Sequence, residues 1–372
     1  MFSKLLQRLK KGEYVRRTIE SMILTGIQEW SRWDNRPASS DSDQKEATTI
    51  ITGAQESGGD SSFAHQNEAK PIEINVRTSI CSVAFLADGK HVVSGGKDGK
   101  IRRWRVEDGQ EAGTPMNTMN SVLDLAVSRD GKWVVSGTRS GLVTVWSARS
   151  HSKVIEWKAH KDWVRAVDLS PDGMRIATGS DDRTLCVWSP STGQRLLDPL
   201  ELDNKLAAVK FSPNGCLIAT ATNTVRVYDG RDGTCLSDVP VDVYSGLNQS
   251  LAWASDSKQL FALSRDGNIN RLDVFTGTTL SQWAIHSSDK ARCISLASNG
   301  KFIAACANSS ISFWDTATRE QIGSVIEHTH DVLSMAHSTN YDLVVGGDKT
   351  ITLWGHLDIL PSRYFDNVCV SA

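Results

Sequence analysis

Three sets of side chains in this sequence have the types and spacing that chemistry requires. His160 with Asp182 would suit a general base that is held in place by a carboxylate. His328 and His330 alternate along the chain, so on a strand both imidazoles would share one face, as in a metal-binding pair. Asp181 and Asp182 are adjacent carboxylates, as in a hydrolase that uses paired acids. Each functional interpretation competes with a structural one, which depends on where the residues lie.

The signatures of several common enzyme classes are missing from the sequence. It contains no G-x-x-x-x-G-K-[ST] phosphate loop, no G-x-S-x-G nucleophile elbow and no H-E-x-x-H helix. No cysteine or carboxylate cluster accompanies the histidine pair at ligand spacing. We therefore predict no catalytic residue, no metal site, no cofactor and no small-molecule substrate. The alternative is an enzyme whose site is assembled in the centre of the fold from distant segments.

A regular repeat organises the chain. A short turn recurs with its second members 42, 42, 42, 42 and 43 residues apart, at Asp88-Gly89, Asp130-Gly131, Asp172-Gly173, Asn214-Gly215, Asp256-Ser257 and Asn299-Gly300. Asp-Gly and Asn-Gly between alternating apolar runs predict β-hairpins, since such turns need positive φ. The third strand of each repeat ends in a large residue, at Trp104, Trp146, Trp188, Tyr228, Leu272, Trp314 and Trp354. One such unit cannot bury its own apolar face, so we predict that the seven copies stack.

The third repeat resembles the WD-repeat family most closely, through Ala159-His160, the turn Ser170-Pro171-Asp172-Gly173, the run from Thr178 to Asp182, and the run from Leu185 to Trp188. The Trp-Asp pair that names the family stands in register at Trp314-Asp315. The resemblance implies an all-β, seven-bladed propeller with four strands in each blade, and we assign it to residues 71–362. It also implies that a strand at residues 72–76 completes the last blade.

The resemblance implies a structural role for His160. In the family, a histidine before the first strand bonds an aspartate in the turn between strands two and three, and a Ser or Thr and a Trp extend this network. Only the third repeat carries all four residues, as His160, Thr178, Asp182 and Trp188, whereas the fifth repeat keeps Asp266. Because buried polar groups need partners, we interpret these residues as a structural network rather than as a catalytic site.

A candidate working face follows from the repeat positions. If His160 reaches Asp182, the loop before the first strand and the turn after the second strand lie on one face. Eight residues at these positions form a basic set with one tryptophan: Lys97, Arg139, Trp163, Arg165, Lys205, Arg265, Lys290 and Arg292. Because Trp and Arg are typical interface anchors, we predict that this face binds an acidic or phosphorylated segment of a partner protein. The alternatives are a solvated surface without a partner, RNA, and anionic lipid headgroups.

The ends of the chain differ from the repeats. Apolar residues recur at helical spacing in residues 1–35, and up to residue 36 there are eight basic and four acidic residues. We predict an amphipathic helical extension that binds a partner or itself. The alternatives are that it lies on a membrane surface, that it is a mitochondrial transit peptide, and that it packs against the propeller. Residues 36–70 are rich in Ser, Asp, Gly and Gln, which predicts a flexible linker. Residues 363–372 form a predicted C-terminal tail.

Composition restricts the classes of function. The 372 residues contain 41 Lys and Arg against 43 Asp and Glu, a net charge of −2, which argues against an obligate nucleic-acid binder. There is no run of 18 apolar residues, so we expect no membrane-spanning helix. The seven cysteines form no C-x-x-C pair and no secretory signal precedes them, which favours a reducing compartment, the cytoplasm or alternatively the nucleus.

Together these observations favour a non-enzymatic scaffold or adaptor that brings proteins together. The main alternative is an adaptor for membranes or RNA that uses the basic face and the N-terminal extension together. An enzyme with a site in the central channel is the third hypothesis, and clustered acids or histidines in that channel would favour it.

Overall fold

The computed structural model describes residues 71–243, 249–285, 291–338, 342–355 and 360–365. They belong to the second of the two units into which the chain divides, His65–Ala372. Their secondary structure consists of β-strands and one short 3-10 helix, η2 (Ser362–Tyr364). The predicted helical extension at residues 1–35 and the linker at 36–70 lie outside the described residues. In the described part of the chain, no helix has the length and apolar character that a membrane span needs.

Five sheets contain four antiparallel strands each and follow one another along the chain. The first contains β5 (Val122–Val127), β6 (Trp133–Thr138), β7 (Leu142–Ser147) and β8 (Lys153–Lys158). The second contains β9 (Val164–Leu169), β10 (Ile176–Ser180), β11 (Thr184–Trp188) and β12 (Leu200–Glu201). The third contains β13 (Ala208–Phe211), β14 (Leu217–Ala221), β15 (Val225–Asp229) and β16 (Cys235–Val239). The fourth contains β17 (Leu251–Trp253), β18 (Gln259–Leu263), β19 (Asn268–Asp273) and β20 (Thr278–Ala284), and the fifth contains β21 (Ala291–Leu296), β22 (Phe302–Ala307), β23 (Ser310–Asp315) and β24 (Gln321–Glu327).

The sixth sheet joins the two ends of the repeat region. Its six strands, in spatial order, are β25 (Val332–His337), β26 (Leu343–Trp354), β1 (Ile72–Phe85), β2 (His91–Gly96), β3 (Lys100–Arg105) and β4 (Met116–Asn117). The beginning of β1 pairs with the end of β26, with Ile72 opposite Leu353, and the rest of β1 pairs with β2. As expected, residues 72–76 therefore pair with the last repeat.

The predicted number of blades is wrong. With each hydrogen-bonded sheet counted as a blade, the propeller has six blades and not seven. The reason is that β1 and β26 are both long strands that bend without breaking, so the first and last repeats share one sheet. A continuous sheet at this place leaves no open edge where the ring closes.

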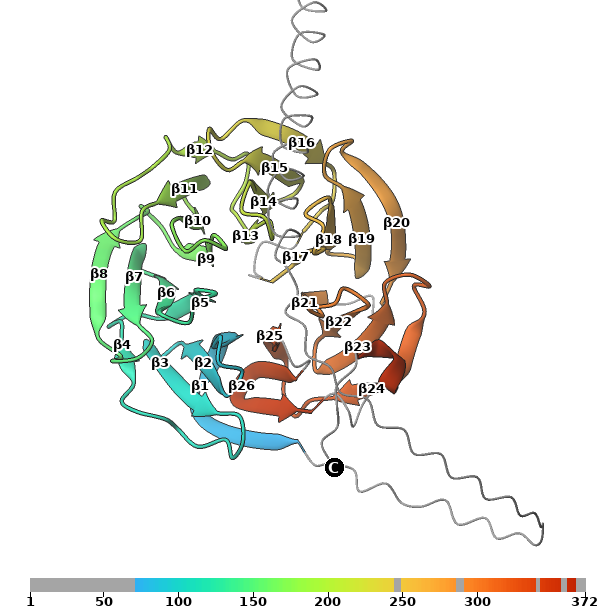
Figure 1. Cartoon of the computed structure of the whole chain (residues 1–372), viewed down its shortest axis with the longest axis horizontal. Helices are drawn as coiled ribbons and strands as arrows, with labels where there is room; N and C mark the ends of the chain where they lie inside the picture. The colour runs from blue at the N-terminus through green and yellow to red at the C-terminus, as the bar shows by residue number, and fades with distance from the viewer. Residues whose placement is uncertain (1–70, 244–248, 286–290, 339–341, 356–359, 366–372) are drawn as a thin grey trace, which may run out of the picture. The chain divides into compact units, whose positions relative to one another are not determined.

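The blades surround a central axis, and the first strand of each four-stranded blade lies toward it (Figure 1). The last strands, β8, β16, β20 and β24, lie at the outer edge, as does the short β12 of the second blade (Figure 1). Small residues on the second strands let the next blade approach closely. A Cβ atom on Gly137 of β6 would lie 2.7 Å from Val164 of β9, and one on Gly95 of β2 would lie 2.5 Å from Val122 of β5. Glycine at these positions therefore permits the packing between blades.

The recurring turns have the backbone conformation that their sequences predict. Gly173 has a φ of 69°, and Ser257, which stands where the other repeats have glycine, has a φ of 56°. A residue with a side chain is strained in this region. The hydroxyl of Ser257 accepts a hydrogen bond from the main-chain nitrogen of Asn214, 3.1 Å away, so this turn is held by the neighbouring blade.

The end of the described chain packs against the fifth four-stranded blade. Tyr364 and Phe365 are buried, and their rings meet the ring of Phe302 edge to face at 6.1 and 6.5 Å. The hydroxyl of Tyr364 also donates a hydrogen bond to Asp315, 2.9 Å away. These two residues of the predicted tail therefore take part in a hydrophobic core.

Candidate protein-docking face

The four residues of the predicted structural network lie together in the blade formed by β9–β12. His160 precedes β9, Thr178 is on β10, Asp182 is in the following turn and Trp188 ends β11. The Nδ1 atom of His160 lies 3.1 Å from Asp182 Oδ2, and its Nε2 atom lies 2.7 Å from Thr178 Oγ1. Trp188 Nε1 donates to the same hydroxyl of Thr178 at 2.8 Å. Both imidazole nitrogens therefore have protein partners, as a structural role requires.

The sequence interpretation missed Thr184, which completes the network. Its hydroxyl lies 3.0 Å from His160 Nδ1 and donates to Asp182 Oδ1 at 2.7 Å. Burial alone would raise the pKa of Asp182, but hydrogen bonds from His160 and Thr184 outweigh it and hold that pKa well below its usual range. The carboxylate of Asp182 is therefore charged at neutral pH and accepts hydrogen bonds.

We expect His160→Ala to lower the free energy of unfolding by about 1–3 kcal/mol, because it removes the buried imidazole that is hydrogen-bonded to both Asp182 and Thr178. The loss should shrink below pH about 4, since a carboxyl with a depressed pKa stabilises the fold above its unfolded pKa and ceases to do so as the pH falls. Urea denaturation at neutral and acidic pH measures both effects. An equal loss with His330→Ala, whose side chain is exposed, would contradict this assignment.

The other repeats use the same positions differently. Trp104 Nε1 donates to Ser94 and Trp146 Nε1 donates to Ser136, at 2.8 and 3.0 Å, as Trp188 does to Thr178. In the last repeat, however, His328 Nδ1 lies 2.8 Å from the main-chain oxygen of His330, and its Nε2 atom lies 3.5 Å from Thr350 Oγ1. Asp348 instead accepts a hydrogen bond from Ser79 of β1 at 2.5 Å. In the part of the chain that the structure describes, no group of three or more His, Cys, Asp or Glu residues could hold a metal ion.

Two arginines stack on Trp163. The guanidinium carbon of Arg139 lies 4.1 Å from the centre of the indole ring, and that of Arg165 lies 4.4 Å from it. Trp163 ends the loop before β9, Arg139 is in the turn between β6 and β7, and Arg165 is on β9. Trp163 and Arg165 are two residues apart at the start of β9, so their side chains share one face, and the contact of Arg139 with the same ring places Arg139 there too. The sequence predicted all three residues for that face.

Asp181 changes the charge of this cluster. Arg165 donates from Nε and Nη2 to the two carboxylate oxygens of Asp181, both at 2.9 Å, and Lys205 Nζ lies 3.5 Å from Oδ2. Asp181 is buried, so this bidentate pair fixes the guanidinium of Arg165 against Trp163. Arg139 is exposed, and no carboxylate of the described residues lies within ion-pair distance of it. The available positive charge therefore belongs to Arg139 more than to Arg165.

The remaining predicted residues divide into two groups. Lys97 is exposed in the turn between β2 and β3, and Ser121 connects this turn with that of Arg139 through hydrogen bonds to both. We call Lys97, Arg139, Trp163, Arg165 and Lys205 the docking face. Arg265, between β18 and β19, and Arg292, on β21, lie on blades farther along the ring than these five residues, and Arg292 donates to Asp331 at 2.9 Å. Lys290 lies outside the described residues.

The central channel contains charged groups that the sequence analysis did not identify. It has a volume of about 380 Å³, and residues of β1, β5, β9, β13, β17, β21 and β25 line it. Asp168 on its wall accepts a hydrogen bond from the main chain of Phe211 at 2.6 Å and lies 3.6 Å from Lys210 Nζ. Asp124, which is buried, accepts one from the main chain of Val167 at 2.9 Å. Each carboxylate thus joins two neighbouring inner strands, which favours a structural role over a catalytic one.

Comparison with known proteins agrees with this geometry. The profile of the family described as "WD domain, G-beta repeat" matches residues 74–105, 113–147, 151–189, 277–315 and 319–355. The chain belongs to the WD-repeat family, whose propellers are typical protein-interaction scaffolds and are generally non-enzymatic. A comparison with curated proteins finds no match. Between residues 190 and 276 the family profile has no match, and this stretch contains the two repeats whose third strands end in Tyr228 and Leu272 instead of tryptophan.

Proposed function

We propose that the protein is a non-enzymatic adaptor whose docking face binds an acidic or phosphorylated segment of a partner protein. The observation that supports this most directly is the contact of the guanidinium groups of both Arg139 and Arg165 with the ring of Trp163. Stacking on an aromatic ring uses the flat side of a guanidinium group and leaves its N–H edge available for a carboxylate or phosphate. The cluster is thus suited to recognise an anion beside an apolar group.

Asp181 gives Arg139 and Arg165 different roles. Because Asp181 already binds Arg165 through two hydrogen bonds, Arg165 mainly positions Trp163, and Arg139 meets the anion of the partner. Lys205, with 52% of its side chain exposed, and Lys97 extend the positive charge on either side. An extended acidic segment that crosses these turns would meet basic groups in succession.

A protein partner suits the docking face better than a polyanion without apolar groups. Met119, on the loop between Lys97 and Arg139 in the fold, has 82% of its surface exposed. Trp163 is also partly exposed. Apolar side chains of a partner would cover both residues, as in the buried centre of a protein interface.

We expect Arg139→Glu and Trp163→Ala each to weaken binding of an acidic segment by about 30-fold, the effect of losing an interface hot spot. The probe is a fluorescein-labelled peptide of Glu, Leu and phosphoserine, and fluorescence polarisation measures its Kd. Arg129→Glu is the matched control, because Arg129 is exposed in the turn between β5 and β6, which is at the other end of the strands. Arg165→Glu is a poor test, since it places a second carboxylate against buried Asp181.

Comparison of ligands separates the proposal from its alternatives. The acidic peptide should bind more tightly than a peptide with Gln and Ser in place of Glu and phosphoserine, than single-stranded RNA, and than phosphatidylserine vesicles. Loss of binding with added salt is expected for every anion and does not discriminate among them. Tighter binding of the RNA or the vesicles, or equal binding by wild type and Arg139→Glu, would refute the proposal.

A further inference from the structure

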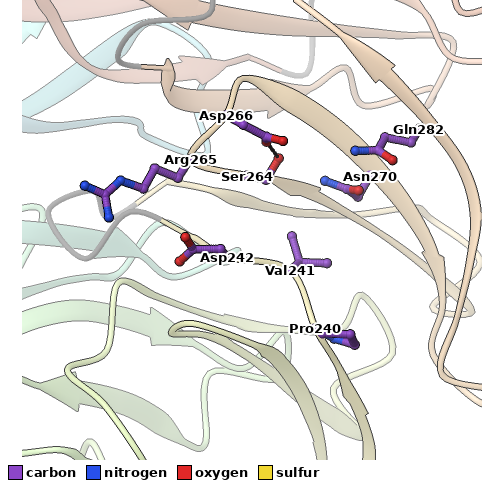
Figure 2. Close-up of a pocket in the computed structure, with 8 residues that line it drawn as sticks. All are labelled: Pro240, Val241, Asp242, Ser264, Arg265, Asp266, Asn270 and Gln282. Carbon is purple, nitrogen blue, oxygen red and sulfur yellow. Dashed lines mark hydrogen bonds between the residues drawn. The ribbon is translucent and has the colours of Figure 1, made fainter.

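A pocket of about 310 Å³ opens between the blade of β13–β16 and the blade of β17–β20 (Figure 2). It is lined by Pro240, Val241, Asp242, Ser264, Arg265, Asp266, Asn270 and Gln282. All of these residues except Gln282 lie in the stretch that the family profile does not match. The pocket uses the turn between β18 and β19, which corresponds to the turns that carry Arg139 and Asp182, so it opens on the same side of the ring as the docking face.

Asp266 has lost the partner that its counterpart in the third repeat retains. It is the turn aspartate of the fifth repeat, as Asp182 is of the third, but the sequence has no histidine between residues 240 and 250 to bond it. Its carboxylate instead accepts a hydrogen bond from Ser264 Oγ (Figure 2). It accepts a second one from Asn268 Nδ2 at 2.7 Å. The bond from Ser264 is the main cause that lowers the pKa of Asp266, so this carboxylate is charged at neutral pH.

A second carboxylate borders the pocket at Asp242. Its main-chain oxygen accepts a hydrogen bond from the main-chain nitrogen of Arg265 at 2.7 Å, which fixes the segment after β16 to the turn between β18 and β19. Its side chain is exposed, and neither Asp242 nor Asp266 forms an ion pair with a basic side chain of the described residues. Figure 2 shows the guanidinium group of Arg265 directed away from Asn270 and Gln282.

Amides and an apolar side chain complete the lining. Asn270 is 5% exposed, and its Nδ2 atom lies 3.3 Å from the main-chain oxygen of Ala262 and 3.2 Å from that of Asn268. These two hydrogen bonds orient the amide, so its oxygen is the atom left to accept from a ligand. Gln282 adds a second amide, and Val241 is buried beneath the pocket. The lining therefore combines two carboxylates, two amides and an apolar wall with one cation, Arg265, so acidic groups outnumber basic ones.

We propose that this pocket binds the guanidinium group of an arginine from a partner protein. A guanidinium group has five N–H donors in a plane and matches a site with several separate acceptors, and its aliphatic stem suits the apolar wall. The volume is at the small end of ligand pockets, which fits one side chain. The arginine site lies apart from the docking face and has the opposite charge, so a partner with both acidic and basic segments would be held in one orientation.

The test uses the full chain and acetyl-Gly-Arg-Gly-amide as the probe, with binding followed by ligand-observed NMR. We expect saturable binding that is about tenfold weaker for the citrulline analogue, which keeps the shape but lacks the charge. Free L-arginine should also bind more weakly, because its carboxylate would approach Asp242. Equal binding of the citrulline peptide would overturn the charge argument, and tighter binding of free arginine would overturn the assignment to a partner protein.

Variants locate the binding. Asp242→Asn and Asp266→Asn should each weaken the probe about tenfold, whereas Glu107→Gln, an exposed change in the turn after β3, should not. Asp242 has no side-chain hydrogen bond to the described residues, so its variant tests the site even if Asp266→Asn unfolds the turn. Unchanged binding in Asp242→Asn, or no saturable binding by wild type, would refute the proposal. Both variants should still bind the acidic peptide, so this proposal and the proposed function can fail separately.

Discussion

Lys210→Met is expected to lower the free energy of unfolding by about 3 kcal/mol, because it removes the cation whose charge acts on two carboxylates of the inner strands, those of Asp168 and of the buried Asp124. Lys210 Nζ lies 3.6 Å from Asp168 Oδ1, and the charge of Asp124 also acts on it. Burial alone would lower the pKa of Lys210, but these two carboxylates outweigh it and raise that pKa. The side chain of Lys210 is 30% exposed to the channel, so we expect the lower end of the range for buried pairs.

The loss of stability in Lys210→Met should depend on pH, and the direction of this dependence identifies the group that causes it. Burial raises the pKa of Asp124 to about 6, against the opposing effects of Lys210 and of hydrogen bonds from Val167 and Ser82. A carboxyl with a raised pKa stabilises the fold below its unfolded pKa of about 4, and this contribution is lost as the pH rises through 6. Without Lys210 the charged form of Asp124 is destabilised further. The Lys210→Met variant should therefore lose more stability at pH 8 than at pH 5.

Urea denaturation at the two pH values measures this difference. Lys132→Met is the matched control, since Lys132 pairs with Asp130 at 2.9 Å on the surface and its side chain is 69% exposed. The control should change the free energy of unfolding by less than about 1 kcal/mol at either pH. If Lys210→Met loses as little as this control, or loses the same amount at pH 5 and pH 8, the carboxylates do not depend on Lys210.

The sequence predicted the features within each repeat better than the way in which the first and last repeats join. Turn types and the large residues ending third strands depend on neighbours within one repeat, so periodicity reveals them. The number of blades depends on whether β1 and β26 continue through their bends, and hydrogen bonding between the two ends of the chain decides this. The family resemblance identified the pairing of residues 72–76 but could not show that one sheet results.

In the candidate site, too, the sequence predicted the positions of single residues better than the contacts between them. Arg139, Trp163 and Arg165 were predicted because each occupies a defined repeat position on one face. The bond between Arg165 and Asp181 was missed, since it requires two side chains of adjacent strands to have particular rotamers. The inner polar residues Ser82, Asp124, Asp168 and Lys210 did leave a signal, because they follow one another at 42, 44 and 42 residues. Their charges differ, so no motif marks them.

The second large effect is expected when the chain begins at residue 80, which removes the strand that closes the ring. The segment deleted from β1 buries Ile74 and Val76 and pairs with β26 from Ile72 opposite Leu353 to Asn75 opposite Thr350. Burial of the two side chains alone is worth about 5 kcal/mol, and its loss should lower Tm by roughly 10 °C. The exposed edge of β26 should also make the shortened chain prone to associate.

A chain that begins at residue 71 is the control for this deletion, because it keeps the whole of β1 and lacks only residues that precede it. Differential scanning calorimetry of the two shortened chains and the full chain compares their melting. If the chain from residue 71 melts like the full chain and the chain from residue 80 melts far lower, the stabilisation comes from residues 71–79. Ile74→Asp in the full chain should reproduce part of the loss, since it puts a charge into the core formed with Ile351 and Leu353. A chain from residue 80 that melts within about 2 °C of the full chain would show that the last repeat is stable without this strand, and that packing around the channel closes the ring.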